Sequence, residues 1–484
     1  MTISGALSNA MTGLRAAGRG AEIVSSNISN ALTPGYGRRV LELSADGVGG
    51  AGGVRIDGVN RAVDEGIASD KRLADAEQGH AQTAANFYAK LETLMGTPDD
   101  PNSVSARVAQ FETALITAAS RPEAPERLSQ AVTDARSLAS SIAQTSDGLQ
   151  DARSLADRTI AEQVTKLNTA LQQVQTLNSQ ITAAQVQSVD ATSLQDHRQQ
   201  LVDEISALVP VRVVPRDHGQ IALYSTGGAI LLDGSAGEVG FEPVNMVTPY
   251  MSVEAGTLSG LTLNGNPLRT GSEDGALRGG AIGAQFAIRD EMAVTAQVEL
   301  DALARDLITR FQDPSVDPTL AAGDAGLFTD EGGAFDPADE LGLAARISVH
   351  AAVDPTQGGE AWRIRDGISA IAPGDAGNAS LLQSLASALN QGQPPASGSF
   401  SGGSYALIEL VSTITADIGA ERGNADQVLS FATTRLNELT ERQLADGVDS
   451  DDEIQRLMII EQTYAANARV IEAVDEMMQT IMRL

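Results

Sequence analysis

The stretch NISNALTPGYGRRVLEL (residues 27–43) marks the sharpest change of pattern in the chain. Evenly spaced apolar residues lead up to it, and RRVLELSAD alternates as a β-strand does. A helix is not expected to pass through this stretch, because Pro34 biases Thr33 away from helical dihedral angles and Gly35 readily adopts positive φ. We therefore predict a hinge turn, between an N-terminal helix and a strand, at Thr33, Pro34, Gly35 and Tyr36.

Residues 3–28 carry small or apolar side chains at alternating intervals of four and three, the heptad pattern of helices that pack side by side. The positions are Ile3, Leu7, Ala10, Leu14, Ala17, Ala21, Val24 and Ile28. Glycines interrupt this segment, and each costs a helix interior about 1 kcal/mol. Because such a helix is marginal alone, we expect a partner to cover the seam. The alternative is an ordinary amphipathic helix within its own domain.

The end of the chain repeats this pattern. Its seam positions are Leu457, Ile460, Tyr464, Asn467, Ile471, Val474, Met478 and Ile481. A polar residue such as Asn467 at one seam position costs stability but fixes the register of a helix pair. We predict that the two terminal seams form a coiled coil and assemble with other copies. A plain amphipathic C-terminal helix is the alternative.

The fold class predicted for the chain is mainly α with a β-rich insertion, built from long antiparallel helices. At 484 residues the chain exceeds the size at which a single core stops growing. Short strands are expected in the β-rich parts, for example at ARISVHA and WRIRD. The predicted units are a terminal coiled-coil region (1–32 and 450–484), a helical body with a β-hairpin (33–210, 276–312 and 404–449) and an outer β-rich domain (211–275 and 313–403).

Composition excludes several functions. The formal net charge of −30 argues against nucleic acid as a partner, because phosphate binding needs an excess of Lys and Arg. The chain has no cysteine, which excludes disulfides and thiolate chemistry. No apolar run approaches the roughly 20 residues of a membrane span, and the N-terminus lacks the pattern of a cleaved signal peptide.

Motifs for chemistry are weak, so we predict no metal, no cofactor and no enzyme. None of the four histidines has another histidine three or four residues away. The string at 47–52 matches a dinucleotide fingerprint but precedes a strand instead of a helix, which favours a glycine-rich hairpin loop. The acidic run at 446–453 has Ile454 where a calcium loop starting at Asp449 needs glycine, so we expect it to cap a helix.

Both ends of the chain resemble the axial proteins of the bacterial flagellum. SSNISNALTPGYGRR (25–39) is similar to their Asn-Ile-x-Asn…Pro-Gly-Tyr element, although Arg39 stands where the family commonly has Gln. Residues 53–72 and 448–484 resemble the segments that follow it and that end the chain in the hook and hook-associated group. Segments in the middle narrow the resemblance to the hook-associated proteins at the hook–filament junction: 111–132, 193–214 and 277–311.

This resemblance implies a structural component of the flagellum, an adaptor between hook and filament without catalysis. Its implied partners are other copies in a helical ring, hook protein on one side, a second junction protein on the other, and an export chaperone. It also implies an extracellular location, reached through the flagellar type III apparatus with an uncleaved N-terminus.

Two alternatives stay open. The first is a hook or distal-rod protein, which would be β-rich where residues 111–132 and 193–214 predict helices. The second is a secreted glycan hydrolase embedded in an axial protein, which would need a pair of acids in a cleft of residues 211–403.

Overall fold

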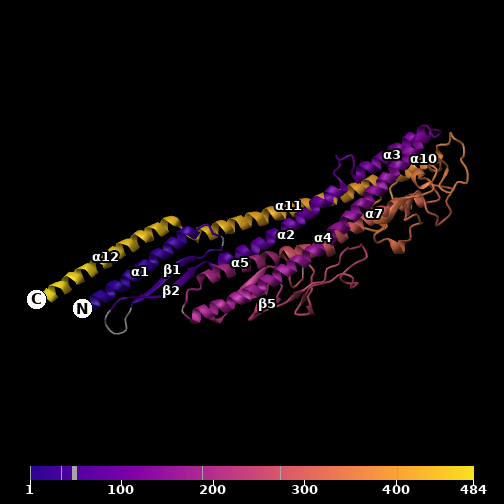
Figure 1. The fold of residues 1–484 in the computed structure, drawn as a ribbon. Coiled ribbons are helices and arrows are strands. Elements are labelled where there is room, and N and C mark those ends of the chain that lie inside the picture. Colours follow the sequence, from indigo (N-terminus) through magenta and orange to yellow (C-terminus); the bar gives the residue numbers. More distant parts are fainter. Residues whose placement is uncertain are drawn as a thin grey trace.

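Long helices run nearly the whole length of the molecule and give it an extended shape (Figure 1). The computed structural model describes residues 2–33, 35–45, 52–187, 189–272, 274–400 and 402–483. Most of the body consists of α2 (Glu65–Met95), α3 (Val104–Ser120), α4 (Pro125–Val186), α5 (Thr192–Leu208), α7 (Ala293–Gln312) and α11 (Leu407–Ala445). The mainly helical character predicted from the sequence is confirmed. Pro34 and the glycine-rich loop at 46–51 lie outside the described residues.

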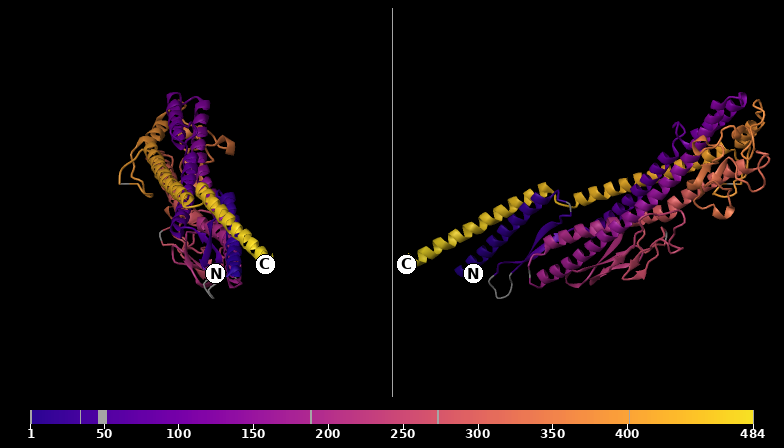
Figure 2. Two further views of the ribbon diagram at one scale, coloured as in Figure 1. Left: turned by 90° about the vertical axis from the view of Figure 1, so that its left-hand side faces the viewer. Right: turned by 45° about the vertical axis from the view of Figure 1, so that its right-hand side comes forward.

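Both termini lie at one end of the molecule (Figures 1 and 2). There α1 (Ile3–Asn30) contacts α12 (Ser450–Arg483) and the hairpin of β1 (Arg38–Ala45) and β2 (Val54–Ala62). The hairpin is antiparallel and pairs Arg38 with Ala62, with a register shift between Glu42 and Leu43. Asp449 caps α12, because its Oδ1 accepts hydrogen bonds from the backbone N–H groups of Asp451 (2.8 Å) and Asp452 (3.3 Å).

The core at the far end joins α3, the first half of α4, α7, α11 and α10 (Ser380–Asn390) with the two-stranded sheet β10–β11 (Phe328–Asp330 and Ile347–Val349). Three phenylalanines form its centre, with ring centroids 5.2–6.0 Å apart: Phe111, Phe311 and Phe328. Aromatic contacts of this kind add to the free energy of burial. Most of segment 313–403 therefore belongs to this end of the body.

A second core joins the other half of α4, α5 and α6 (Gly280–Ala287) with small antiparallel sheets. One sheet has the order β3-β4-β5-β6 (Val211–Pro215, Ile221–Ser225, Ile230–Asp233 and Ser235–Ala236). The other has the order β7-β8-β9 (Val239–Gly240, Thr262–Leu263 and Asn266–Pro267). The two β-rich segments of the sequence thus contribute to different cores along the rod.

Buried arginines attach the irregular segments to the helices. Arg289 lies in η2 (Ile288–Met292), a π-helical turn between α6 and α7, and its Nη1 donates to Asp157 Oδ1 at 2.6 Å. Arg153 of α4 donates to the backbone oxygens of Thr248 (3.0 Å) and Met251 (2.8 Å). Because charged groups satisfy these backbone oxygens, the strand-poor chain around residue 250 is fixed against α4.

Two predictions differ from the structure. The described part of 313–403, predicted to be β-rich, contains the three-residue strands β10 and β11 but also the 11-residue helix α10. WRIRD, expected as a strand, contains the helix α9 (Arg363–Asp366), and Gly367 ends it at φ 116°. Arg365 donates to Pro122 O and pairs with Asp366, contacts that a strand would not place on one side. The remaining short elements are η1 (Asp217–Gly219), η3 (Pro337–Asp339), α8 (Leu343–Arg346) and η4 (Pro355–Gln357). Across the described ranges, no helix combines the length and the apolar character needed to span a membrane.

Candidate assembly surface of the terminal helices

The helices α1 and α12 run in opposite directions along each other, and glycines of α1 set how closely they approach. A Cβ added to Gly13 would lie 2.8 Å from the Asn467 Nδ2 atom, and one on Gly20 would lie 3.1 Å from the Ile460 Cδ1 atom. Gly18, by contrast, has no other atom within 4 Å of such a Cβ. Seven residues along α1 match seven residues back along α12, which is the register of a heptad pair.

Asn27 closes this register at the body end of the pair and is fully buried. Its Nδ2 donates to Glu453 Oε2 of α12 (3.0 Å) and to the backbone oxygen of Arg39 (2.9 Å). Its Oδ1 accepts from the Tyr36 hydroxyl and the backbone N–H of Arg39, both at 2.9 Å. One amide thus uses its two donors and two acceptor sites to join α1, the turn, β1 and α12. We call this group, Asn27 with Tyr36, Arg39 and Glu453, the asparagine node.

Asp196 of α5 attaches the node to the body. Its carboxylate accepts from Arg61 Nε (2.7 Å), from the backbone N–H of Gly37 (3.0 Å) and from Arg39 Nη2 (3.5 Å). Arg39 also donates to Ser193 Oγ at 3.0 Å and lies over the Tyr36 ring, 5.1 Å from its centroid. The residue that departs from the family motif, Arg39, therefore reaches α5 and links it to the end of α1.

Of the predicted hinge residues, Thr33, Gly35 and Tyr36 are described, and hydrogen bonds of a turn connect them to the end of α1. Thr33 donates its N–H to Asn30 O (2.9 Å), and Tyr36 donates its N–H to Thr33 O (3.1 Å). Gly35 has φ 78°, and a Cβ there would lie 2.7 Å from Gln200 Cγ, so glycine is required by both conformation and space. Tyr36 is half-buried and bonded to Asn27, as an anchor of the turn would be.

The predicted α1 seam is covered to different extents. Ala10, Ala17 and Val24 are buried, while the other five positions are half-buried: Ile3, Leu7, Leu14, Ala21 and Ile28. The column that contains Gly13, Gly20 and Asn27 lies beside this seam, and sequence reasoning missed it because apolar residues were taken as the signal. The seven-residue spacing of small residues could have revealed it.

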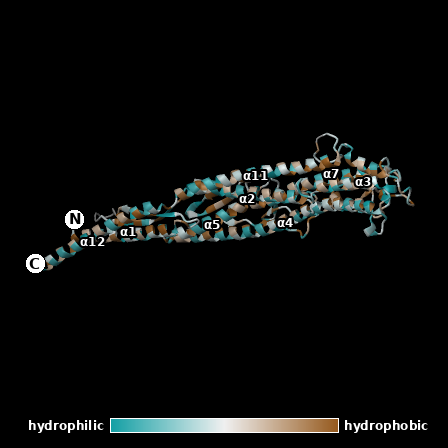
Figure 3. Ribbon diagram, turned by 90° about the horizontal axis from the view of Figure 1, so that it is seen from above, coloured by the Kyte–Doolittle hydropathy of each residue, from teal (hydrophilic) through white to brown (hydrophobic). Residues whose placement is uncertain are grey.

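The predicted α12 seam divides into two parts. Val474 is buried and Leu457, Ile460, Asn467 and Ile471 are half-buried, whereas Tyr464, Met478 and Ile481 are exposed. Continuing the heptad register along both helices carries the residues after Met477 past the start of α1. The C-terminus indeed extends beyond the N-terminus (Figure 3).

A second apolar row on α12 faces neither α1 nor the body. Ile459, Val470 and Met477 are 62%, 42% and 48% exposed. Their intervals of eleven and seven residues are close to whole turns of a 3.6-residue helix, so they lie on one face. Ile459 is turned by roughly 100° from Ile460, which faces Gly20, and Val470 by roughly 40° from the buried Val474, so this row lies beside the covered face of α12. We call these three residues the α12 stripe.

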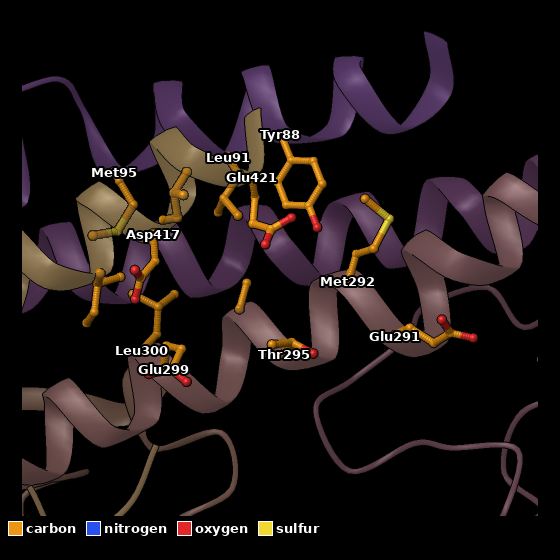
Figure 4. Close-up of a pocket in the computed structure, with 13 residues that line it drawn as sticks. Tyr88, Leu91, Met95, Glu291, Met292, Thr295, Glu299, Leu300, Asp417 and Glu421 are labelled. Carbon is orange, nitrogen blue, oxygen red and sulfur yellow. The ribbon is translucent and has the colours of Figure 1, made fainter. Parts of the chain in front are cut away.

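A helix-lined pocket lies in the body, between α2, α11 and the turn η2 with α7 (Figure 4). It has a volume of about 280 Å³ and an apolar floor that includes Leu91, Met95 and Leu300. Its acidic residues are Glu291, Glu299, Asp417 and Glu421, of which Glu291 and Glu299 accept hydrogen bonds from backbone N–H groups. Among the described residues no group of three or more His, Asp or Glu side chains could hold a metal ion.

Comparison with known families agrees with this arrangement. Residues 445–484, which include α12, match the family described as flagellar basal body rod FlgEFG protein C-terminal. The C-terminal segment is thus similar to that of a class of flagellar proteins. Residues 73–323 match the family described as flagellar hook-associated protein FlgK helical domain. That match spans more than half of the chain, and the chain belongs to the FlgK family of flagellar hook-associated proteins.

Individual relatives carry the same name. Flagellar hook-associated protein 1 of Salmonella typhimurium is 29% identical over 289 residues, which are 57% of this chain and 51% of the relative. That of Escherichia coli is 27% identical over 57% of this chain and 52% of the relative, so the chain spans about half the length of both. That of Bacillus subtilis is 22% identical over 94% and 93% of the two chains.

A solved structure also matches. It is the flagellar hook junction protein FlgK from Burkholderia pseudomallei, with 21% identity and a TM-score of 0.45 over 54% of this chain and 46% of that chain.

Proposed function

We propose that the protein is a structural component of the bacterial flagellum, an adaptor at the junction between hook and filament that assembles through α1 and α12. The observation that carries this proposal is the α12 stripe, together with membership of the FlgK family. Three exposed apolar residues on one face of a helix need cover, because exposed apolar rows of this kind mark interaction sites. A neighbouring copy in a helical assembly would supply that cover through heterologous contacts.

The role proposed for each part of the chain follows the boundaries predicted from the sequence. The terminal region (1–32 and 450–484) would form the coiled-coil part of the assembly, held by the seams of α1 and α12 and by the turn at residues 33–36. The helical body comprises 33–210, 276–312 and 404–449, and the outer β-rich parts comprise 211–275 and 313–403, as two separate lobes. Hook protein on one side, a second junction protein on the other and an export chaperone are the proposed partners. The proposed location is extracellular, after export without cleavage.

The test uses a bacterium that lacks its own copy of the gene and produces this chain or a variant. Substituting Val470 and Met477 with Asp places two charges on the α12 stripe, where burial against a neighbour would cost several kcal/mol. We expect the amount in sheared flagella to fall by at least about tenfold, and motility to be lost, while the thermal unfolding of the purified monomer stays unchanged.

The control for each single substitution, Val470→Asp or Met477→Asp, is Ala465→Asp, which adds one negative charge to another exposed face of α12. It should leave incorporation and motility intact. Normal incorporation of the Val470/Met477 variant would contradict the proposed assembly surface. Recovering the variant from the culture medium separates failed assembly from failed export.

The hook or distal-rod alternative is less well supported. Residues 111–132 and 193–214 are largely helical in α3, α4 and α5, and the FlgK helical domain matches across them.

We further propose that the chain is not an enzyme. The acidic pocket of Figure 4 is the place to test the glycan-hydrolase alternative, because hydrolysis of this kind needs two carboxyl groups across a bound sugar. Clear degradation of peptidoglycan by the purified chain, lost in Glu291→Gln or Asp417→Asn, would overturn this proposal.

A further inference from the structure

Four arginines line a pocket at the base of the β1–β2 hairpin, in a protein whose net charge is −30. We call it the arginine pocket, and its arginines are Arg61, Arg72, Arg198 and Arg216. It lies between the start of α2, the middle of α5 and strands β3 and β4, and has a volume of about 360 Å³. Of the described residues that line it, Glu65 is the carboxylate, and its side chain is 66% exposed.

Arg72 is the deepest of these cations, with 4% of its side chain exposed. Its Nε is buried and makes no hydrogen bond to the described residues. The closest carboxylate oxygens belong to Asp203, 3.8 Å from Nε, and Glu65, 3.9 Å from Nη2. Both distances exceed that of a hydrogen bond, so a buried, charged donor is left without an acceptor. Such a donor costs free energy unless something occupies the space beside it.

Arg198 has N–H donors that no described hydrogen bond uses. Its Nη1 donates to Asn178 Oδ1 (2.8 Å) and to Gly219 O (2.7 Å), which fixes the guanidinium in the pocket wall. No described hydrogen bond uses its Nε or Nη2. Burial lowers the pKa of Arg198 to about 10, and the charge of Arg61 contributes to the same direction. The pKa of Arg72 is also lowered, first by burial. Carboxylates lie beside the other three arginines: Asp196 beside Arg61, Asp203 and Glu65 beside Arg72, and Asp233 beside Arg216. Among the described residues, Arg198 is the arginine of this pocket for which no ion pair is seen, and Arg72 Nε is the donor without an acceptor.

We propose that the arginine pocket binds a small oxyanion of the phosphate or carboxylate class. Guanidinium groups donate N–H bonds in a fork that matches both anions, and such charge-assisted bonds are stronger than neutral ones. The oxyanion would accept from Arg72 and Arg198, while Arg216 at the rim is already paired with Asp233 through its Nε (3.1 Å) and Nη2 (2.9 Å). Because Arg61 also binds Asp196, the occupied pocket adjoins the contacts that hold the asparagine node on α5.

The test is titration of the full-length chain with inorganic phosphate in a calorimeter, with ionic strength held constant by sodium chloride. We expect one phosphate per chain, and an affinity weakened by about tenfold or more in Arg198→Gln, which removes one charge-assisted partner. Arg269→Gln is the control, because Arg269 is 79% exposed and pairs with Asp274 outside the pocket. No binding at millimolar phosphate, or equal binding by Arg198→Gln, would overturn the proposal.

A second variant tests the pocket without removing an arginine, because an arginine variant could fail to fold. Gln195 lines the pocket, and Gln195→Glu replaces its amide by a carboxylate of the same size. The built-in carboxylate should raise the melting temperature in phosphate-free buffer and abolish the further rise that phosphate causes in the parent chain. A Gln195→Glu chain that is less stable and gains as much from phosphate as the parent would count against the site.

The oxyanion could be a free anion or a carboxylate side chain of a second copy of the chain. Analytical sedimentation of the parent chain with and without phosphate distinguishes these two ligands. If phosphate dissociates self-associated parent chains but not those of Arg198→Gln, a carboxylate of a second copy fills the pocket in the assembly. If self-association is indifferent to phosphate while calorimetry shows binding, the ligand is a free anion. Either result supports the oxyanion site.

Discussion

At the residue scale, the side chain of Asn27 holds the turn around Tyr36 against α1 and α12. Asn27 joins four segments of the chain: its bonds to Tyr36 and Arg39 are local, whereas its bond to Glu453 links the two ends of the sequence. An apolar replacement would keep the helix but leave the buried carboxylate of Glu453 and the N–H of Arg39 without this partner. The asparagine is therefore retained for its four hydrogen bonds rather than for helix formation.

We expect Asn27→Ala to destabilise the contact of α1 with α12 by about 1–3 kcal/mol, the cost of unsatisfied buried polar groups. Amide hydrogen exchange should accelerate in residues 20–30 and 450–457, with little change in α4. Asn30→Ala removes a hydrogen bond within α1 to Ser26 O and is the control. Unchanged exchange in the first variant would show that the node does not hold the pair.

A histidine supplies a prediction about pH. Burial lowers the pKa of His80 in α2, and the nearby charge of Glu291 opposes this only partly. The unfolded chain thus binds a proton more readily than the folded one, so stability falls as the pH drops below about 6.5. We expect His80→Gln to reduce the difference in urea midpoint between pH 5.5 and pH 7.5. His197→Gln, at an exposed position of α5, should leave that difference as it is in the parent.

At the element scale, spacing in the sequence predicted the two terminal helices but not how they face each other. The helices at 3–30 and 450–483 follow from the heptad intervals and from the Asp449 cap. The contact through Gly13 and Gly20 was missed although their spacing of seven residues is visible in the sequence, because glycine lowers helix propensity and its role in close packing appears only when a partner is present. The π-helical turn at 288–292 also has no spacing signal, since it depends on buried Arg289.

Two glycines of α1 allow a direct comparison. Gly20→Leu places a side chain where Ile460 already lies. It should separate α1 from α12 and reduce the protection of both helices against amide exchange. Gly18→Ala meets open space and should raise helix stability by about 1 kcal/mol. Circular dichroism and amide exchange of the purified monomer would measure both. A Gly20→Leu chain with undisturbed exchange would contradict the close approach of the two helices.

At the scale of the whole molecule, the rod has two cores and a terminal pair that projects from one end (Figure 2). The pattern of residues predicted helices and β-rich segments. It did not predict that 211–275 and 313–403 contribute to separate cores, because no local signal tells which part of a 62-residue helix a loop packs against. The arginine pocket was equally hidden: its arginines are spread over residues 61–216 and converge only in the fold.

Protection against amide exchange should therefore be graded along the rod. The middle of α4, where both cores meet, should exchange most slowly, and α12 after Met477 should exchange fastest, since it passes the end of α1. A monomer in which residues 478–483 are as protected as α4 would contradict this arrangement and would leave no free end for a neighbour.

The bond between Asn27 and Glu453 spans 426 positions of the sequence. A ribosome makes Asn27 long before Glu453, so α1 stays without this partner until the intervening residues have been made. Closing so large a loop is entropically favoured only after the intervening domains have condensed and brought its ends together. We therefore expect the contact between α1 and α12 to form after the two cores of the body.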